Sequence, residues 1–205
     1  MSSVNTPLIR LIPNILTIAR LILVPLFVLL MTIPSALFLD YAVVVFVIGV
    51  VTDYLDGIIA RKFDAVTELG KLLDPLADKL LVLSALIMLV AQRSEVTGAP
   101  WVPGWMVVLI FAREFWVTGL RGIAASQGII VAASSSGKLK SALQMMAIIL
   151  LLLHGKADFR SGDFLFIGDR VGLNLLLTSI VISYWGAAEY SWKLYTGEHQ
   201  SSMSE

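Results

Sequence analysis

Six runs of mainly apolar residues alternate with short polar segments along this chain. A helix needs roughly 20 residues to cross the hydrocarbon core of a bilayer, and it satisfies its own backbone hydrogen bonds there. The pattern therefore predicts an all-α polytopic membrane protein with six transmembrane helices. The predicted spans cover residues 14–33, 36–60, 72–92, 103–125, 137–154 and 172–194.

The composition supports this class of protein. Of the 205 residues, 58% are hydrophobic and only 15% are charged, whereas soluble domains carry about a quarter charged residues. We expect a single membrane-embedded domain over residues 1–196, with a short interfacial segment at 1–13 and a disordered polar tail at 197–205. The net charge of +0 does not favour a nucleic-acid partner, and the absence of cysteine excludes disulfides and thiolate metal sites.

The distribution of basic residues predicts the orientation. Cytoplasmic loops are enriched in Lys and Arg. If the N-terminus lies in the cytoplasm, eleven of the fifteen Lys and Arg residues fall at cytoplasmic ends of the spans. Both termini are then cytoplasmic, and so is the segment between the second and third spans.

Four aspartates lie at the edge of the predicted hydrocarbon region around that segment. Asp53 and Asp56 fall near the end of the second span, and Asp74 and Asp78 near the start of the third. Spacings of three and four residues place each pair on one face of its helix. Because a short loop joins the two helices, we expect them to be antiparallel neighbours with the two pairs facing each other.

Four carboxylates in a site of low dielectric constant cannot all ionise without compensation. Divalent cations provide that compensation, and oxygen ligands select hard ions such as Mg²⁺ or Mn²⁺. Two ions held in this way are a recurrent arrangement for phosphoryl transfer. Two alternatives are ordinary helix-end charges paired with nearby Lys and Arg, and a cation or proton transporter. Transporters, however, tend to place such carboxylates near the membrane midplane.

The same stretch resembles the signature of the CDP-alcohol phosphotransferase family. The matching residues and spacings are Asp53-x2-Asp56-Gly57-x2-Ala60-Arg61-x8-Gly70-x3-Asp74-x3-Asp78. Four further stretches are similar to bacterial family members that use glycerol 3-phosphate. They read PNILTIAR at 13–20, LDPLADK at 73–79, AREFWVTGLR at 112–121 and GKLKSALQM at 137–145.

The resemblance implies transfer of a phosphatidyl group from CDP-diacylglycerol to glycerol 3-phosphate with release of CMP. A sister enzyme with another acceptor, such as inositol phosphate, is the alternative within the family. Two Mg²⁺ or Mn²⁺ ions would be held by Asp53, Asp56, Asp74 and Asp78, and Asp78 would also act as general base. The resemblance further implies a homodimer in the bacterial cytoplasmic membrane, with its active site on the cytoplasmic side.

The resemblance also suggests which residues bind CDP-diacylglycerol. The residues carried over are Gly57, Ala60, Arg61, Thr67 and Gly70. Thr17 is added because Asn14, Thr17 and Arg20 share one helix face, where they would reach the nucleotide. The alternative is that Asn14 caps the helix and Arg20 anchors it at the interface.

A group of basic residues in the fourth and fifth spans suits a phosphorylated acceptor. The predicted phosphate-binding residues are Arg113, Arg121, Lys138 and Lys140. A buried arginine needs an anion, which is either a bound phosphate or the neighbouring Glu114. The alternative is therefore an Arg–Glu pair together with lysines that reach out to the interface.

Overall fold

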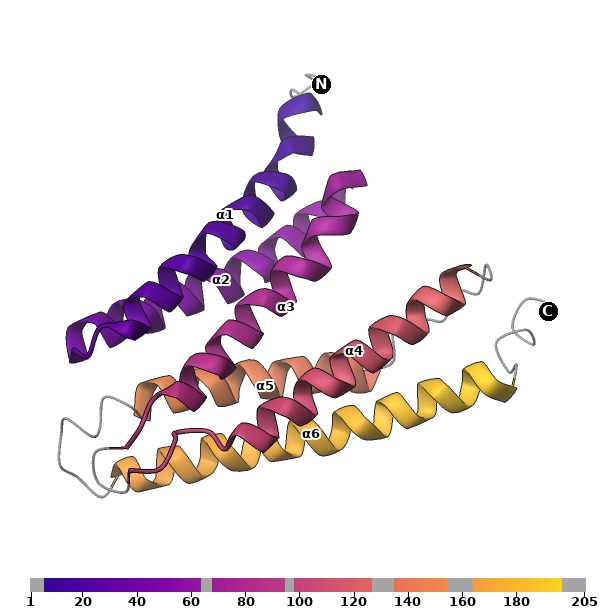
Figure 1. Ribbon diagram of the computed structural model, residues 1–205. Coiled ribbons are helices and arrows are strands. Elements are labelled where there is room, and N and C mark those ends of the chain that lie inside the picture. Colours follow the sequence, from indigo (N-terminus) through magenta and orange to yellow (C-terminus); the bar gives the residue numbers. More distant parts are fainter. Residues whose placement is uncertain (1–5, 64–67, 95–97, 127–134, 155–163, 197–205) are drawn as a thin grey trace.

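The computed structural model describes residues 6–63, 68–94, 98–126, 135–154 and 164–196 (Figure 1). Within these ranges the chain forms six α-helices joined by short segments. They are α1 (Thr6–Thr32), α2 (Ala36–Phe63), α3 (Glu68–Ala91), α4 (Gly104–Ser126), α5 (Ser135–His154) and α6 (Phe164–Thr196). The prediction of six helices is confirmed.

The helices form two groups of three. In the first group, α1 packs along both α2 and α3; in the second, α4 and α5 each pack against α6 (Figure 1). The two groups meet where α5 contacts α2 and α3, and where α4 contacts α3. Helix α3 therefore belongs to the first group and also touches two helices of the second.

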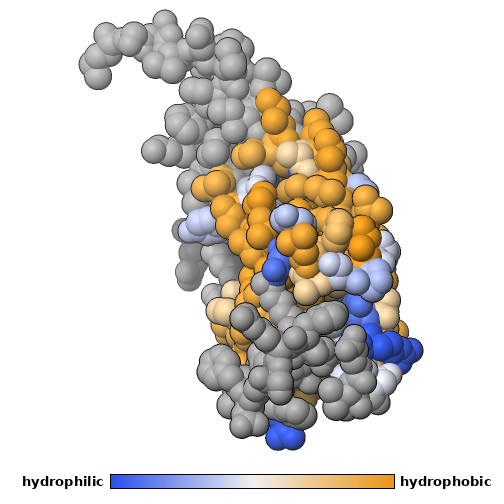
Figure 2. All heavy atoms as spheres, turned by 90° about the vertical axis from the view of Figure 1, so that its left-hand side faces the viewer, coloured by the Kyte–Doolittle hydropathy of each residue, from blue (hydrophilic) through white to orange (hydrophobic). Residues whose placement is uncertain are grey.

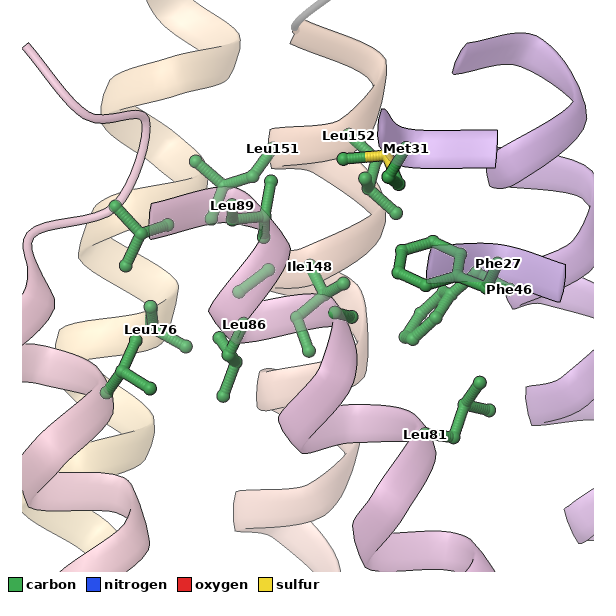
Figure 3. Close-up of a cluster of buried hydrophobic side chains, with 14 of the residues drawn as sticks. Phe27, Met31, Phe46, Leu81, Leu86, Leu89, Ile148, Leu151, Leu152 and Leu176 are labelled. Carbon is green, nitrogen blue, oxygen red and sulfur yellow. The ribbon is translucent and has the colours of Figure 1, made fainter. Parts of the chain in front are cut away.

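A core of apolar side chains joins the two groups (Figure 3). The rings of Phe27 on α1 and Phe46 on α2 lie 5.9 Å apart between centroids. Leu86 on α3 and Ile148 on α5 belong to the same cluster, and all four side chains are fully buried. Because lipid is itself apolar, close van der Waals packing of these side chains, rather than their removal from water, holds α3 against α5.

Two glycines allow neighbouring helices to approach closely. A Cβ atom at Gly49 on α2 would lie 2.6 Å from Cδ2 of Leu81 on α3. A Cβ atom at Gly172 on α6 would lie 2.8 Å from Cγ of Leu151 on α5. Each distance is shorter than a normal contact, so a larger residue would push these helices apart.

The surface of the bundle is apolar, as expected of a membrane protein. Large apolar side chains such as Phe115, Val181 and Trp185 are mostly exposed, and apolar residues cover much of the face seen in Figure 2. Among the described residues, three helical segments are long and apolar enough to cross a membrane: Ile15–Thr32, Ala36–Leu55 and Arg170–Thr196. Such exposure is stable when lipid surrounds the helices.

The first and last helices differ in their starting points from the prediction. Helix α1 starts at Thr6 and continues through Pro13, and α6 starts at Phe164. Each begins eight residues before the predicted span. The prediction followed only the apolar run, whereas a helix continues wherever its backbone bonds persist.

The start of α1, the end of α2 and the start of α3 lie at one end of the bundle (Figure 1). The aspartate motif belongs to this end.

Candidate functional site

A buried ion pair links α1 to the aspartate motif on α2. Nη1 of Arg20 lies 2.8 Å from Oδ1 of Asp53. The Arg20 side chain is fully buried, whereas 32% of the Asp53 side chain is exposed. A buried guanidinium is stable only beside an anion, so this contact holds α1 and α2 in register.

Thr17 lies one turn before Arg20 and is also fully buried. The two residues share the face of α1 that packs against α2 and α3. The pairing of Arg20 with Asp53 differs from both roles considered for it, nucleotide contact and interfacial anchoring. Asn14 lies inside α1, which starts at Thr6, so it does not cap this helix.

The rest of the aspartate motif lies on helical backbone. Asp56 falls on α2, and Asp74 and Asp78 fall on α3, so the expected spacings along one helix face are present. The side chains of these three residues are outside the described part of the structure. Of the whole motif, Asp53 is the member whose side chain is described, and the described side chains contain no cluster of three potential metal ligands.

The predicted nucleotide-binding residues flank the motif. Gly57, Ala60 and Arg61 lie on the last turns of α2, and Gly70 on the first turn of α3, again with only their backbone described. Thr67 lies outside the described residues.

The donor set suits hard divalent cations. All four predicted ligands are carboxylates, the ligand type that Mg²⁺ and Mn²⁺ prefer. Lys79, which follows Asp78, does not pair with an aspartate among the described side chains; its ammonium donates to the Thr118 hydroxyl on α4 at 2.6 Å. In the alternative in which the aspartates pair with nearby basic residues, Lys79 is one possible partner. In the structure it is directed toward α4 instead.

A second charged cluster lies in the other helix group and is centred on Glu114. Nη1 of Arg113 lies 3.1 Å from Oε1 of Glu114, and the Lys140 ammonium on α5 donates to the same oxygen. Nε of Arg113 also donates to the Ser183 carbonyl on α6 at 2.9 Å. The three charged side chains are largely buried. This cluster, which we call the Glu114 cluster, links α4, α5 and α6.

The structure brings together some of the predicted phosphate-binding residues. Arg113 and Lys140 meet at Glu114, so the alternative of an Arg–Glu pair is present in the structure. Arg121 lies elsewhere: its guanidinium is over the Tyr190 ring, 5.9 Å from the centroid, and its side chain is exposed. Lys138 is on α5, and its side chain is not among those described.

Sequence reasoning missed a cavity beside this cluster. It has a volume of about 30 Å³ and lies between α3, α4 and α5. Its walls are formed by Lys79, Val82, Leu83, Ile110, Glu114, Lys140, Ser141, Gln144 and Met145. The signal that would have indicated it is Gln144, a polar residue inside an apolar span, which typically marks a functional position.

The sequence pattern of the CDP-alcohol phosphatidyltransferase family matches residues 10–186 of this chain. The match covers most of the chain, including the aspartate motif and the Glu114 cluster. The protein therefore belongs to the CDP-alcohol phosphatidyltransferase family, a family of enzymes.

Individual relatives are similar over most of their length. A CDP-diacylglycerol–glycerol-3-phosphate 3-phosphatidyltransferase of Bacillus subtilis is 38% identical over 198 residues, covering 89% of this chain and 95% of the relative. The enzyme of the same name from Rickettsia typhi is 43% identical over 147 residues, covering 72% and 79%. A cardiolipin synthase (CMP-forming) of Oryza sativa is 32% identical over 196 residues, covering 92% of this chain and 59% of the relative.

Proposed function

We propose that this protein is a phosphatidylglycerophosphate synthase, which transfers the phosphatidyl group of CDP-diacylglycerol to glycerol 3-phosphate and releases CMP. The family membership and the relatives with that activity support the proposal. The structural observation that carries it is the separation of charge between two neighbouring sites. The four aspartates of the motif belong to the backbones of α2 and α3, whereas Arg113 and Lys140 converge on a single carboxylate between α4 and α5.

In the proposed reaction, the acceptor hydroxyl oxygen attacks the phosphorus that carries the diacylglycerol group. The new oxygen–phosphorus bond forms as the bond from that phosphorus to the bridging oxygen of CMP breaks, and CMP leaves with the electron pair. Asp78 takes the hydroxyl proton as general base. This role is supported by its position on α3, one turn after Asp74, on the helix face that would carry the metal ligands.

Asp53, Asp56, Asp74 and Asp78 would hold two divalent cations, consistent with the use of divalent metals in this family. When bound, such ions offset the charge on the phosphoryl oxygens and on the departing phosphate. Arg20 fixes the position of Asp53 through its ion pair. The small residues Gly57, Ala60 and Gly70, together with Thr17, Arg61 and Thr67, would line the CDP site.

Arg113 and Lys140 would receive the phosphate of the acceptor; Lys138 stays a predicted contact, as does Arg121, which stands apart from the pair over Tyr190. In the structure, Arg113 and Lys140 share Glu114. One carboxylate against two cations leaves a net positive charge at this site, which favours a dianionic ligand. A phosphate placed here can accept hydrogen bonds from both cations while Glu114 keeps their side chains in place.

We further propose that all six helices cross the bacterial cytoplasmic membrane, with both termini and the active site on the cytoplasmic side. The distribution of Lys and Arg supports this orientation. The diacyl chains of the donor then stay in lipid while its headgroup reaches the aspartate motif at the helix ends. We expect a homodimer, as the resemblance to the family implies.

A second acceptor is suggested by the similarity to a CMP-forming cardiolipin synthase. The expected acceptor of such an enzyme is phosphatidylglycerol, a lipid whose phosphate is a monoanionic diester. The excess positive charge of the Glu114 cluster favours the dianionic monoester of glycerol 3-phosphate instead.

The test is CMP release by the purified protein in detergent with CDP-diacylglycerol and Mg²⁺ or Mn²⁺. Glycerol 3-phosphate, inositol phosphate and phosphatidylglycerol are supplied separately. We expect release with glycerol 3-phosphate and a lipid product that carries a terminal phosphate. Release only with another acceptor would contradict the assigned acceptor, and no release from folded protein would favour the transporter alternative.

A further inference from the structure

The cavity between α3, α4 and α5 has room for a small polar group. Its volume of about 30 Å³ suffices for a water molecule or a hydroxyl group. Lys79, Glu114, Lys140 and Ser141 contribute polar or charged atoms to its lining. A cavity of this size whose lining includes several polar and charged residues is suited to a small ligand group that forms hydrogen bonds.

Gln144 contributes a hydrogen-bond donor without a protein partner in the described part of the structure. Its side chain lines the cavity, the residue is only 4% exposed, and Nε2 is buried. A buried donor that forms no hydrogen bond destabilises a protein by about 1–3 kcal/mol. Such a group is retained where a ligand or a bound water accepts its hydrogen bond.

The cavity adjoins both proposed halves of the active site. Val82 in its wall follows Asp78 by one turn and lies on the same stripe of α3 as Asp74 and Asp78. Four residues correspond to about 6 Å along the helix axis. Lys140, on the opposite wall, belongs to the Glu114 cluster. An acceptor held between this stripe of α3 and the cations of the Glu114 cluster would therefore lie beside the cavity.

Glycerol 3-phosphate has its functional groups in the matching order. Its reacting hydroxyl and its phosphate are at opposite ends, and a secondary hydroxyl lies between them. With the reacting hydroxyl directed toward Asp78 and the phosphate at Arg113 and Lys140, the secondary hydroxyl would lie between them, within reach of the cavity.

We propose that this cavity is the subsite for the secondary hydroxyl of the acceptor, and that Gln144 determines specificity by donating a hydrogen bond from Nε2 to that oxygen. The inference rests on the function proposed above and adds a residue to it. A site that contains an unpaired donor disfavours an acceptor without the matching hydroxyl, because the donor then stays unsatisfied.

The test compares glycerol 3-phosphate with propane-1,3-diol monophosphate, which keeps the reacting hydroxyl and the phosphate but lacks the secondary hydroxyl. We expect the wild type to show a kcat/KM for glycerol 3-phosphate at least about tenfold higher than for the diol phosphate. A tenfold difference corresponds to about 1.4 kcal/mol, the interaction energy that the missing hydroxyl would supply. In Gln144→Leu, kcat/KM for glycerol 3-phosphate falls about tenfold, while that for the diol phosphate changes less than about twofold.

Gln92→Leu is the matched control. Gln92 lies at the far end of the bundle, where its Nε2 donates to the Met31 carbonyl at 2.8 Å, so its loss leaves the preference between the two acceptors unchanged. Gln144→Met, with a side chain of similar length, provides the same comparison if the leucine variant does not fold.

The outcomes separate this inference from the proposed function. An equal loss with both acceptors in the Gln144 variants, or a wild type without preference between them, would overturn the subsite and leave the proposed function standing. A folded wild type that releases no CMP with glycerol 3-phosphate would overturn both.

Discussion

The two charged sites of the proposed active centre are expected to differ in the sign of the charge that each leaves uncompensated. In the first helix group, one fully buried guanidinium, that of Arg20, pairs with one of four aspartates. In the second, one carboxylate, that of Glu114, is shared by Arg113 and Lys140. If the other three aspartates face Asp53 as proposed, the first site has excess negative charge, whereas the Glu114 cluster has excess positive charge. In a setting of low dielectric constant, such imbalances favour ligands of opposite charge.

This difference suggests a division of labour within one catalytic centre. The aspartates on α2 and α3 would hold metal ions that in turn bind the pyrophosphate of the donor, and the Glu114 cluster would receive the phosphate of the acceptor. Helix α3 connects the two, since it carries Asp74 and Asp78 and also lines the cavity beside Glu114 with Lys79 and Val82.

The largest effect is expected from Asp74→Asn, which removes the charge of one of the four proposed metal ligands. We expect turnover to fall at least about a hundredfold, because the charge of the transition state loses its compensation. CMP release measures the effect, and circular dichroism with gel filtration checks that the variant is folded. Near-normal turnover would exclude Asp74 from the mechanism.

Arg20→Met tests the ion pair of the first group. Breaking a buried pair leaves one charge uncompensated, and we expect the free energy of unfolding to fall by about 3 kcal/mol, at the lower end of the usual range because Asp53 is partly exposed. Thermal unfolding in detergent measures the change. Mn²⁺ should raise Tm more in this variant than in the wild type, since it replaces the lost cation.

The double variant Arg20→Met/Asp53→Asn is the control for that pair. It removes both charges, so we expect it to be more stable than Arg20→Met alone in the absence of metal. A double variant whose destabilisation equals the sum of the two single changes would show that Arg20 and Asp53 are not coupled.

Lys140→Ala tests the second group. Loss of a charge-assisted hydrogen bond to phosphate should raise the KM for glycerol 3-phosphate about tenfold while the KM for CDP-diacylglycerol changes little. Arg121→Ala is the comparison: because Arg121 is exposed and lies over Tyr190, its effect should be smaller. Equal changes in both KM values for Lys140→Ala would assign Lys140 a structural role.

The smallest effects concern helix packing. Gly172→Ala places a methyl group against Leu151 and should lower the free energy of unfolding by about 1–3 kcal/mol. Gly122→Ala, on the exposed face of α4 with no atom within 4 Å, should raise it by about 0.5–1 kcal/mol. Thermal unfolding measures both, and a stabilised Gly172→Ala would contradict the close approach of α5 and α6.

The elements that sequence analysis predicted correctly depend on local pattern. Runs of apolar residues marked all six helices, and the aspartate spacing marked the family, because both signals lie within short stretches of chain. The pairing of Arg20 with Asp53 was not predicted, since it depends on how α1 packs against α2. The cavity at Gln144 also depends on packing, here of three helices, so its walls combine residues from distant parts of the chain.

The most direct test of the division between the two groups is Mn²⁺ binding, followed by electron paramagnetic resonance, in the wild type, Asp74→Asn and Lys140→Ala. We predict that Lys140→Ala binds Mn²⁺ as the wild type does, whereas Asp74→Asn loses binding. Unchanged binding in Asp74→Asn, or an equal loss in Lys140→Ala, would contradict the assignment of metal ions to the aspartates and of the acceptor phosphate to the Glu114 cluster.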